Sequence, residues 1–255
     1  MPTANLFDMT GKTALVTGGG TGLGKQFSMT LAQAGANVIL AARRLEPLQQ
    51  TVAAIEARGG SARCILLDLT DERQIDDAFA SSALSDIDVV VNNAGAAAGG
   101  GLLDLTAAAW DQVMDINLKG AWLVARGAAR QMIARQRPGS IVNVASVLAS
   151  SVQKGTANYP TAKAALAHLT RSMAVEWAKY SIRVNAIAPG YFLTDLSAAY
   201  LETDQAKAMT KRLPMRRLGD PSELGGALLL LASNASSYMT GAVLSVDGGL
   251  SVPSI

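Results

Sequence analysis

The chain has 255 residues, of which 49% are hydrophobic, and a formal net charge of +2 at neutral pH. This length is typical of one large α/β domain, and the near-balanced charge, without runs of like charge, argues against a nucleic acid or a membrane surface as partner. A single cysteine, Cys64, excludes an internal disulfide framework and fits a reducing compartment. The first residues lack the pattern of a signal peptide, and the longest apolar run, GGALLLLA, is too short to span a bilayer. We therefore expect a soluble, cytoplasmic protein.

Strands and helices alternate along the whole chain. Runs rich in Val, Ile and Leu predict strands buried on both faces of a parallel sheet, and the segments between them predict helices. We expect strands at 13–17, 37–42, 62–67, 88–92, 140–146, 182–188 and 242–246, and helices at 23–35, 45–60, 107–136, 158–180 and 221–233. The alternation predicts the α/β class: a single doubly wound parallel β-sheet of the Rossmann type, with helices on both faces, in one domain covering residues 1–255.

A glycine-rich turn, TGGGTGLG at 17–24, directly follows the first predicted strand. Glycines at such a place let the backbone turn tightly and let a pyrophosphate approach the N-terminus of the next helix. The common dinucleotide spacing would require a glycine where Leu23 stands. A plain turn between a strand and a helix remains the alternative. The candidate cofactor-binding residues of the turn are Gly18, Gly20, Thr21, Gly22, Leu23 and Gly24.

The second predicted strand ends in AARR at 41–44. A carboxylate at this place would hold the ribose hydroxyls of NAD, but the chain has Ala42 there, followed by Arg43 and Arg44. Arginine can bind a 2′-phosphate, so we expect preference for NADP(H), with NAD(H) as the alternative. The absence of a basic residue between Gly18 and Gly22 weakens this expectation, and a solvated basic pair is the other interpretation.

The segment NYPTAK places Tyr159 and Lys163 four residues apart, on one face of a predicted helix. Pro160 is tolerated in the first turn, where its missing N–H is not needed. The ammonium of Lys163 is expected to lower the pKa of Tyr159 toward neutrality, so that the phenol can exchange a proton with an alcohol or ketone oxygen.

Taken in order, these motifs resemble those of the short-chain dehydrogenase/reductase family. The resemblance includes the glycine turn, NNAG at 92–95, MDINLKG at 114–120, NVAS at 143–146, NYPTAK, PGYFLT at 189–194 and SVDGG at 245–249, and so covers almost the whole chain. It implies a Rossmann fold and a nicotinamide cofactor that carries the hydride. It also implies the catalytic set Asn117, Ser146, Tyr159 and Lys163.

The resemblance further implies the role of each residue. Tyr159 is the general acid for reduction and the base for oxidation, and Ser146 donates a hydrogen bond to the substrate oxygen. Lys163 also binds the nicotinamide ribose, and Asn117 holds a water that relays the proton. Further cofactor contacts are expected from Asp68, Leu69, Asn93, Ala94, Gly95, Pro189, Gly190, Phe192 and Thr194, besides Tyr159 and Lys163. We expect no metal site.

The segment 191–215 falls where the family has a variable substrate lid. The expected pocket comprises Ser146 and Tyr159, walls from Tyr191, Phe192, Leu196 and Tyr200, and an opposite wall from Val147, Leu148 and Gln153. These residues favour a largely apolar carbonyl compound. The basic residues Lys154, Lys211 and Arg212 keep open a polar or acidic substrate, as for gluconate 5-dehydrogenases or 3-oxoacyl carrier-protein reductases. A non-catalytic nucleotide sensor is disfavoured, because it would not need Ser146, Tyr159 and Lys163.

A homotetramer is expected from the small residues of two predicted helices, since such residues let helices approach closely. They are Gly120, Ala121, Ala125, Gly127, Ala128, Ala164 and Ala165. The C-terminal tail LSVPSI could extend to a neighbouring subunit.

Overall fold

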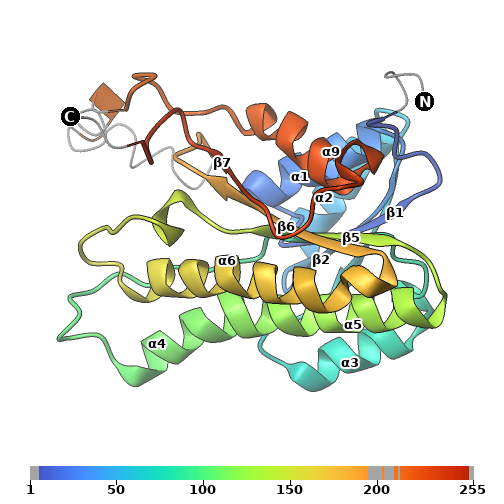
Figure 1. The fold of residues 1–255 in the computed structure, drawn as a ribbon, viewed down its shortest axis with the longest axis horizontal. Helices are drawn as coiled ribbons and strands as arrows, with labels where there is room; N and C mark the ends of the chain where they lie inside the picture. Colours follow the sequence, from blue (N-terminus) through green and yellow to red (C-terminus); the bar gives the residue numbers. More distant parts are fainter. Residues whose placement is uncertain (1–5, 195–202, 204–209, 212, 253–255) are drawn as a thin grey trace.

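Seven parallel strands form one sheet in the computed structural model, which describes residues 6–194, 203, 210, 211 and 213–252 (Figure 1). The spatial order is β3-β2-β1-β4-β5-β6-β7. The strands are β1 Thr13–Thr17, β2 Asn37–Ala42, β3 Ser61–Leu66, β4 Val89–Asn92, β5 Gly139–Val144, β6 Ile182–Pro189 and β7 Val243–Val246. Each predicted strand is present, and the predicted fold class is confirmed.

Helices cover both faces of this sheet (Figure 1). On one face, α1 Gly22–Gln33, α2 Leu45–Glu56 and α9 Gly225–Ala232 pack against strand residues such as Val16 and Val91. On the other, α3 Glu72–Ala80, α5 Ala121–Ala134 and α6 Asn158–Trp177 pack against residues such as Leu15 and Val90. Neighbouring strand residues thus enter opposite cores, which explains the apolar runs Ala14–Val16 of β1 and Val89–Val91 of β4.

Two helical segments differ from the sequence prediction. The helix α3 was not predicted, although Asp71 caps it by accepting a hydrogen bond from the backbone N–H of Gln74. The single helix expected over 107–136 is instead α4 Ala107–Met114, a π-helical segment Asp115–Gly120 and α5. Short π-helical segments inside α-helices occur frequently at functional sites.

Most of the small residues cited for a tetramer are buried within the chain itself. Ala121, Ala125 and Ala128 are at most 4% exposed. A Cβ atom on Gly127 would overlap the ring of Phe79, so this glycine lets α5 approach α3. These residues therefore serve packing inside the chain, and their use as an argument for an interface was wrong. Ala164 and Ala165 on α6 are half-buried.

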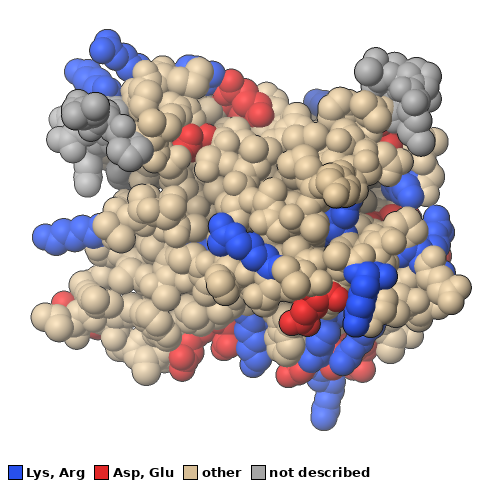
Figure 2. All heavy atoms as spheres, viewed as in Figure 1, with Lys and Arg blue, Asp and Glu red and all other residues tan. Residues whose placement is uncertain are grey.

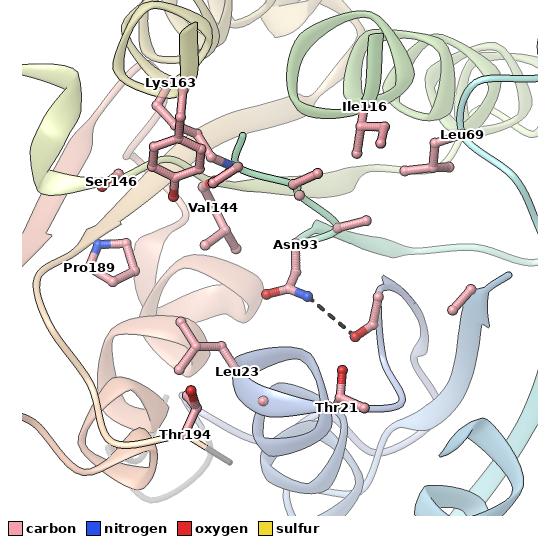
Figure 3. A pocket seen from close by; sticks show the side chains of 18 of the residues that line it. Thr21, Leu23, Leu69, Asn93, Ile116, Val144, Ser146, Lys163, Pro189 and Thr194 are labelled. Carbon is pink, nitrogen blue, oxygen red and sulfur yellow. Dashed lines mark hydrogen bonds between the residues drawn. The ribbon is translucent and has the colours of Figure 1, made fainter. Parts of the chain in front are cut away.

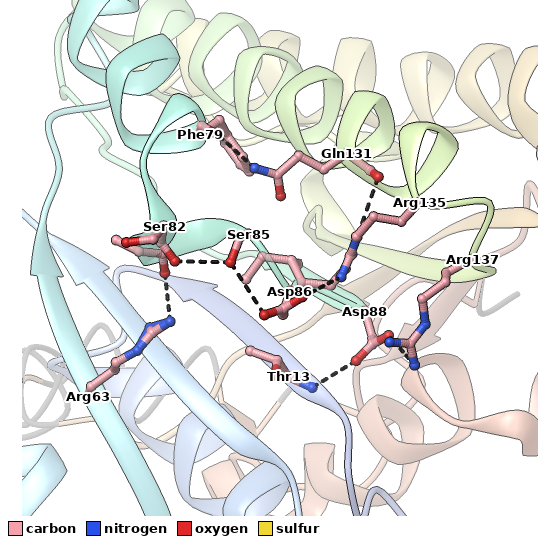
Figure 4. Close-up of polar contacts among 12 residues, drawn as sticks. Thr13, Arg63, Phe79, Ser82, Ser85, Asp86, Asp88, Gln131, Arg135 and Arg137 are labelled. Carbon is pink, nitrogen blue, oxygen red and sulfur yellow. Dashed lines mark hydrogen bonds and ion pairs between the residues drawn. The ribbon is translucent and has the colours of Figure 1, made fainter.

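Polar contacts hold together the edge of the sheet where the parallel strands begin (Figure 4). Asp88 accepts a hydrogen bond from the backbone N–H of Thr13 at 3.0 Å and lies 3.7 Å from Arg137. Arg135 pairs with Asp86 at 3.2 Å.

On the face shown in Figure 2, Lys and Arg lie among Asp and Glu at the lower right. No helix in the described part of the chain is long and apolar enough to cross a bilayer.

Candidate active site

A cavity of about 820 Å³ lies where the strands end, near the point at which the strand order reverses between β1 and β4 (Figure 3). Doubly wound sheets bind their ligands at this place, and the volume lies in the range of cofactor and substrate pockets. Its lining includes these predicted residues: Gly18, Thr21, Gly22, Leu23, Arg43, Arg44, Asp68, Leu69, Asn93, Ala94, Gly95, Ser146, Tyr159, Lys163, Pro189, Gly190, Tyr191, Phe192 and Thr194.

The glycine turn joins β1 to α1 at one side of this cavity. Gly18 has φ +67°, a left-handed conformation that favours glycine, and a Cβ atom there would lie 2.9 Å from Nδ2 of Asn93. That Nδ2 donates hydrogen bonds to the carbonyl of Thr17 and to the carbonyl of Gly18, the second of which is drawn in Figure 3. A Cβ atom on Gly24 would overlap the carbonyl of Gly18. The glycines thus let α1 start close against the turn.

The N-terminus of α1 borders the cavity through Thr21, Gly22 and Leu23. The Thr21 side chain makes no capping hydrogen bond, and the first turn of α1 holds no acidic residue. The first N–H groups of a helix have no partner within the helix, and the helix dipole favours an anion there. This end of the cavity therefore fits the pyrophosphate of a dinucleotide.

Charged groups at the ends of β2 and β3 mark another part of the cavity. Asp68 is partly buried, which acts to raise its pKa. Hydrogen bonds from the N–H and hydroxyl of Thr70, together with the positive charge of Arg43, outweigh that effect, so the pKa of Asp68 is lowered. Arg43 thus lies close enough to Asp68 to act on its carboxylate. An arginine bordering the cavity fits a phosphate better than it fits neutral ribose hydroxyls.

Tyr159, Lys163 and Ser146 meet in the same cavity, from the start of α6 and the end of β5 (Figure 3). The Lys163 ammonium is 5.6 Å from the centre of the Tyr159 ring and donates a hydrogen bond to the Val144 carbonyl at 2.7 Å. Ser146 accepts a hydrogen bond from the N–H of Leu148 at 3.1 Å. Pro160 lies in the first turn of α6, as predicted.

Burial dominates the electrostatics of this group. It raises the pKa of Tyr159, against a hydrogen bond with Ser146 that lowers it, and Tyr191 raises it further. Burial also lowers the pKa of Lys163 from 10.5 to about 8. The expectation that Lys163 brings the pKa of Tyr159 toward neutrality is therefore wrong for the free protein, because desolvation of the phenolate is the largest influence on this pKa and raises it.

Asn117 lies in the π-helical segment behind the cavity lining. Its Nδ2 donates to the carbonyls of Ala96 at 2.7 Å and Val113 at 2.9 Å, while its buried Oδ1 has no hydrogen-bond partner in the described part of the chain. A Cβ atom on Gly95 would lie 2.7 Å from that Oδ1 and 3.6 Å from Nζ of Lys163. Gly95 therefore lets the Asn117 carbonyl and the Lys163 ammonium approach the same place.

Several predicted residues lie outside the cavity lining. Gly20 faces Pro47 and Leu48 of α2, and Val147 is only 3% exposed. Gly24, Asn117, Leu148 and Gln153 are likewise absent from the lining, although Gln153 contacts Tyr191, which is part of it. Leu196 and Tyr200 are outside the described residues, as are Arg212 and the end of the C-terminal tail.

The lining also contains residues that we did not single out as site residues from the sequence. They are Ala41, Ala42, Leu67, Ala96, Ala97, Ile116, Val144 and Ala145. Each lies within three residues of a predicted one, so extending every motif along the chain would have found them. Val144 contributes its carbonyl to Lys163, and a backbone carbonyl leaves no signal in the sequence.

Comparisons with known proteins extend over nearly the whole chain. A family model described as enoyl-(acyl carrier protein) reductase matches residues 18–251. Gluconate 5-dehydrogenase of Gluconobacter oxydans (strain 621H) is 36% identical over 251 residues, covering 97% of this chain and 98% of the relative. A 3-oxoacyl-(acyl-carrier-protein) reductase of Thermotoga maritima is 38% identical over 242 residues, covering 94% and 98%. The crystal structure of a gluconate 5-dehydrogenase from Burkholderia cenocepacia J2315 in complex with NADP and tartrate has a TM-score of 0.92, at 35% identity, and covers 98% of this chain and 99% of that one.

Proposed function

The chain belongs to the short-chain dehydrogenase/reductase family and is an oxidoreductase, and we propose that it interconverts a ketone and a secondary alcohol with NADP(H). The observation that carries the proposal is the convergence of Ser146, Tyr159 and Lys163 in the cavity that also contains the N-terminus of α1. A sensor that only binds a nucleotide has no use for this proton-donating set.

The residues around the cavity fit NADP(H). The pyrophosphate is held by the first turn of α1, and the 2′-phosphate by Arg43, with Arg44 beside it. Among the lining residues, Asp68 and Leu69 would border the adenine, the Asn93–Gly95 segment would lie beneath the cofactor, and Pro189, Gly190, Phe192 and Thr194 would line the nicotinamide side. Bound there, the nicotinamide supplies or accepts the hydride.

Proton transfer falls to the side chains of this chain. Tyr159 gives its phenolic proton to the carbonyl oxygen during reduction and takes it back during oxidation. Ser146 donates a hydrogen bond to the same oxygen, where negative charge develops. Lys163 stays mostly protonated at pH 7, since its pKa is about 8, and its charge favours the phenolate. The unpartnered Oδ1 of Asn117 suits a water that passes the proton outward.

A polar substrate is the second candidate, beside the largely apolar carbonyl compound expected from the sequence. Two similar proteins are named gluconate 5-dehydrogenases, and one of these was crystallised with NADP and tartrate. Tyr191 and Gln153, which both carry polar groups, meet next to the cavity. A 3-oxoacyl carrier-protein substrate is the remaining alternative.

Reduction assays with the purified protein test this proposal. NADPH and NADH absorbance is followed across simple ketones, hydroxyketones, keto sugar acids and β-keto thioesters. Tyr159→Phe should lower turnover by about 10²–10⁴-fold while NADPH binding, measured by fluorescence titration, stays close to that of the wild type. If Tyr159→Phe kept more than a tenth of the wild-type rate, the assigned proton donor would be wrong.

Cofactor preference tests the assignment of Arg43. A hydrogen bond to a charged group is worth about 1.5–3 kcal/mol, which corresponds to a preference of roughly ten- to hundredfold for NADPH in kcat/KM. The double variant Ala42→Asp with Arg43→Ile should reverse it, because the new carboxylate repels a 2′-phosphate and binds ribose hydroxyls. Equal or better use of NADH by the wild type would contradict the assignment.

Assembly and location are also proposals. We place the protein in the cytoplasm as a homotetramer that consists of one domain per chain. The half-buried Ala164 and Ala165 of α6, together with the exposed Val175 on α6 and the partly exposed Trp122 on α5, support an interface through these helices.

A further inference from the structure

The chain that leaves β6 forms one wall of the cavity. It runs from Pro189 to Thr194 along the cavity, and every residue of this segment except Leu193 lines it (Figure 3). The end of the segment lies against the start of α1, because a Cβ atom on Gly22 would be 3.8 Å from Cγ2 of Thr194. The position of the segment therefore sets the width of the cavity between the end of β6 and the first turn of α1.

Gly219 holds this wall from behind, without lining the cavity itself. It forms a parallel bridge with Phe192. The N–H of Gly219 donates to the carbonyl of Tyr191 at 3.0 Å, and its carbonyl accepts from the N–H of Leu193 at 2.9 Å. Both backbone groups of Gly219 are thus bonded to the wall, so the wall cannot shift independently of this contact.

The missing side chain of Gly219 leaves room for the ring of Phe192. A Cβ atom on Gly219 would overlap Cε1 of the ring and would lie 2.6 Å from Cδ1 and 2.9 Å from Cζ. The ring also packs against the core on the α1 side of the sheet, and protein cores are close-packed. With the core on one side, a ring displaced by a new side chain moves toward the cavity that Phe192 lines.

The chain on both sides of Gly219 is anchored. Arg217 donates two hydrogen bonds of 2.7 Å to the carboxylate of Glu223, and Leu224 is fully buried in the core. A side chain added at Gly219 is therefore expected to displace Phe192 rather than Gly219.

We propose that Gly219 is a positioning residue for cofactor binding: by leaving space for the Phe192 ring, it holds the segment 191–194 at the distance from α1 that the nicotinamide half of NADP(H) requires. This proposal rests on the proposed function and deepens it, because it assigns a role in cofactor binding to a residue outside the cavity. The adenosine half is assigned to Arg43 and other residues away from this wall, so its binding should not depend on Gly219.

The test compares two ligands by isothermal titration calorimetry, NADPH and adenosine 2′,5′-bisphosphate, which lacks the nicotinamide half. Strain at the low end of the range for overpacked sites corresponds to about tenfold in Kd. Gly219→Ala should therefore weaken NADPH binding by about tenfold and leave the binding of the bisphosphate close to that of the wild type.

Gly127→Ala is the matched control. A Cβ atom on Gly127 would overlap the ring of Phe79 in the same way, but neither Gly127 nor Phe79 lines the cavity. This variant should lose stability in urea unfolding while both Kd values stay unchanged. The pair of variants thus separates positioning of the wall from a general loss of stability.

Phe192→Val tests the contact from the other side and remains informative if Gly219→Ala does not fold. Valine lacks the ring atoms that the new Cβ atom would meet, so adding Gly219→Ala to Phe192→Val should change the Kd for NADPH by no more than about twofold. An unchanged Kd for NADPH in Gly219→Ala, equal weakening of both ligands, or the full effect of Gly219→Ala on Phe192→Val would overturn the inference and leave the proposed function intact. Absence of NADPH and NADH binding by the wild type would instead contradict the proposed function.

Discussion

Replacing Lys163 by methionine is expected to change the pH dependence of stability. Lys163 is 3% exposed, and burial lowers its pKa from 10.5 to about 8. A difference of 2.5 between these two values corresponds to roughly 3–4 kcal/mol of unfavourable desolvation below pH 8, at about 1.4 kcal/mol per pH unit. The hydrogen bond to the Val144 carbonyl offsets part of it.

The direction of the effect follows from proton binding. The folded protein releases the Lys163 proton near pH 8, while the unfolded chain keeps it until about 10.5. Between these values the unfolded state binds more protons, so the stability of the wild type rises with pH relative to that of Lys163→Met. Between pH 7 and pH 9.5 the relative gain is about 2 kcal/mol.

Urea unfolding of the cofactor-free proteins, at equal protein concentration and followed by tryptophan fluorescence, measures the effect. Lys179→Met, which replaces an exposed lysine, is the matched control, and its difference from the wild type should stay constant. The reasoning is refuted if the difference in unfolding free energy between wild type and Lys163→Met is the same at both pH values.

Three further predictions concern packing and assembly. Gly95→Ala introduces a Cβ atom 2.7 Å from Oδ1 of Asn117 and should lower kcat by up to about 10²-fold through displacement of that carbonyl; an unchanged kcat would contradict the role of Asn117. Gly120→Ala introduces a Cβ atom 2.8 Å from the Cβ and carbonyl oxygen of Leu69. This variant should lose about 1–3 kcal/mol of stability, which calorimetry measures, and its KM for NADPH should rise, which kinetics measure. An unchanged melting temperature or an unchanged KM would contradict the corresponding expectation. Light scattering at micromolar concentration should return the mass of four chains; a monomer mass would reject the tetramer.

The strands could be predicted because burial on both faces leaves a strong signal. In β1, Leu15 enters one core while Val16 enters the other, so the central run Ala14–Val16 has no polar position. Helices with one exposed face give a weaker signal. In α3 only Ile75 is buried, and the many charged residues around it concealed the helix. The π-helical segment at Asp115–Gly120 could not be predicted, because its residues fit a regular helix equally well and only tertiary contacts favour the wider turn.

The types and order of the site residues could be predicted, but the electrostatics between them could not. The spacing of Tyr159 and Lys163 correctly places both side chains on one side of α6. Spacing contains no information on burial, however, and burial decides whether a neighbouring ammonium or the loss of water controls the pKa of a phenol. Here Lys163 directs its ammonium at the Val144 carbonyl, and Tyr191, more than thirty residues away in sequence, acts on Tyr159. The second contact depends on where separate strands end, because Tyr159 lies on α6, which follows β5, whereas Tyr191 follows β6. Functional residues at short, fixed spacings are thus visible as motifs, whereas the contacts that adjust them depend on the sheet that brings them together.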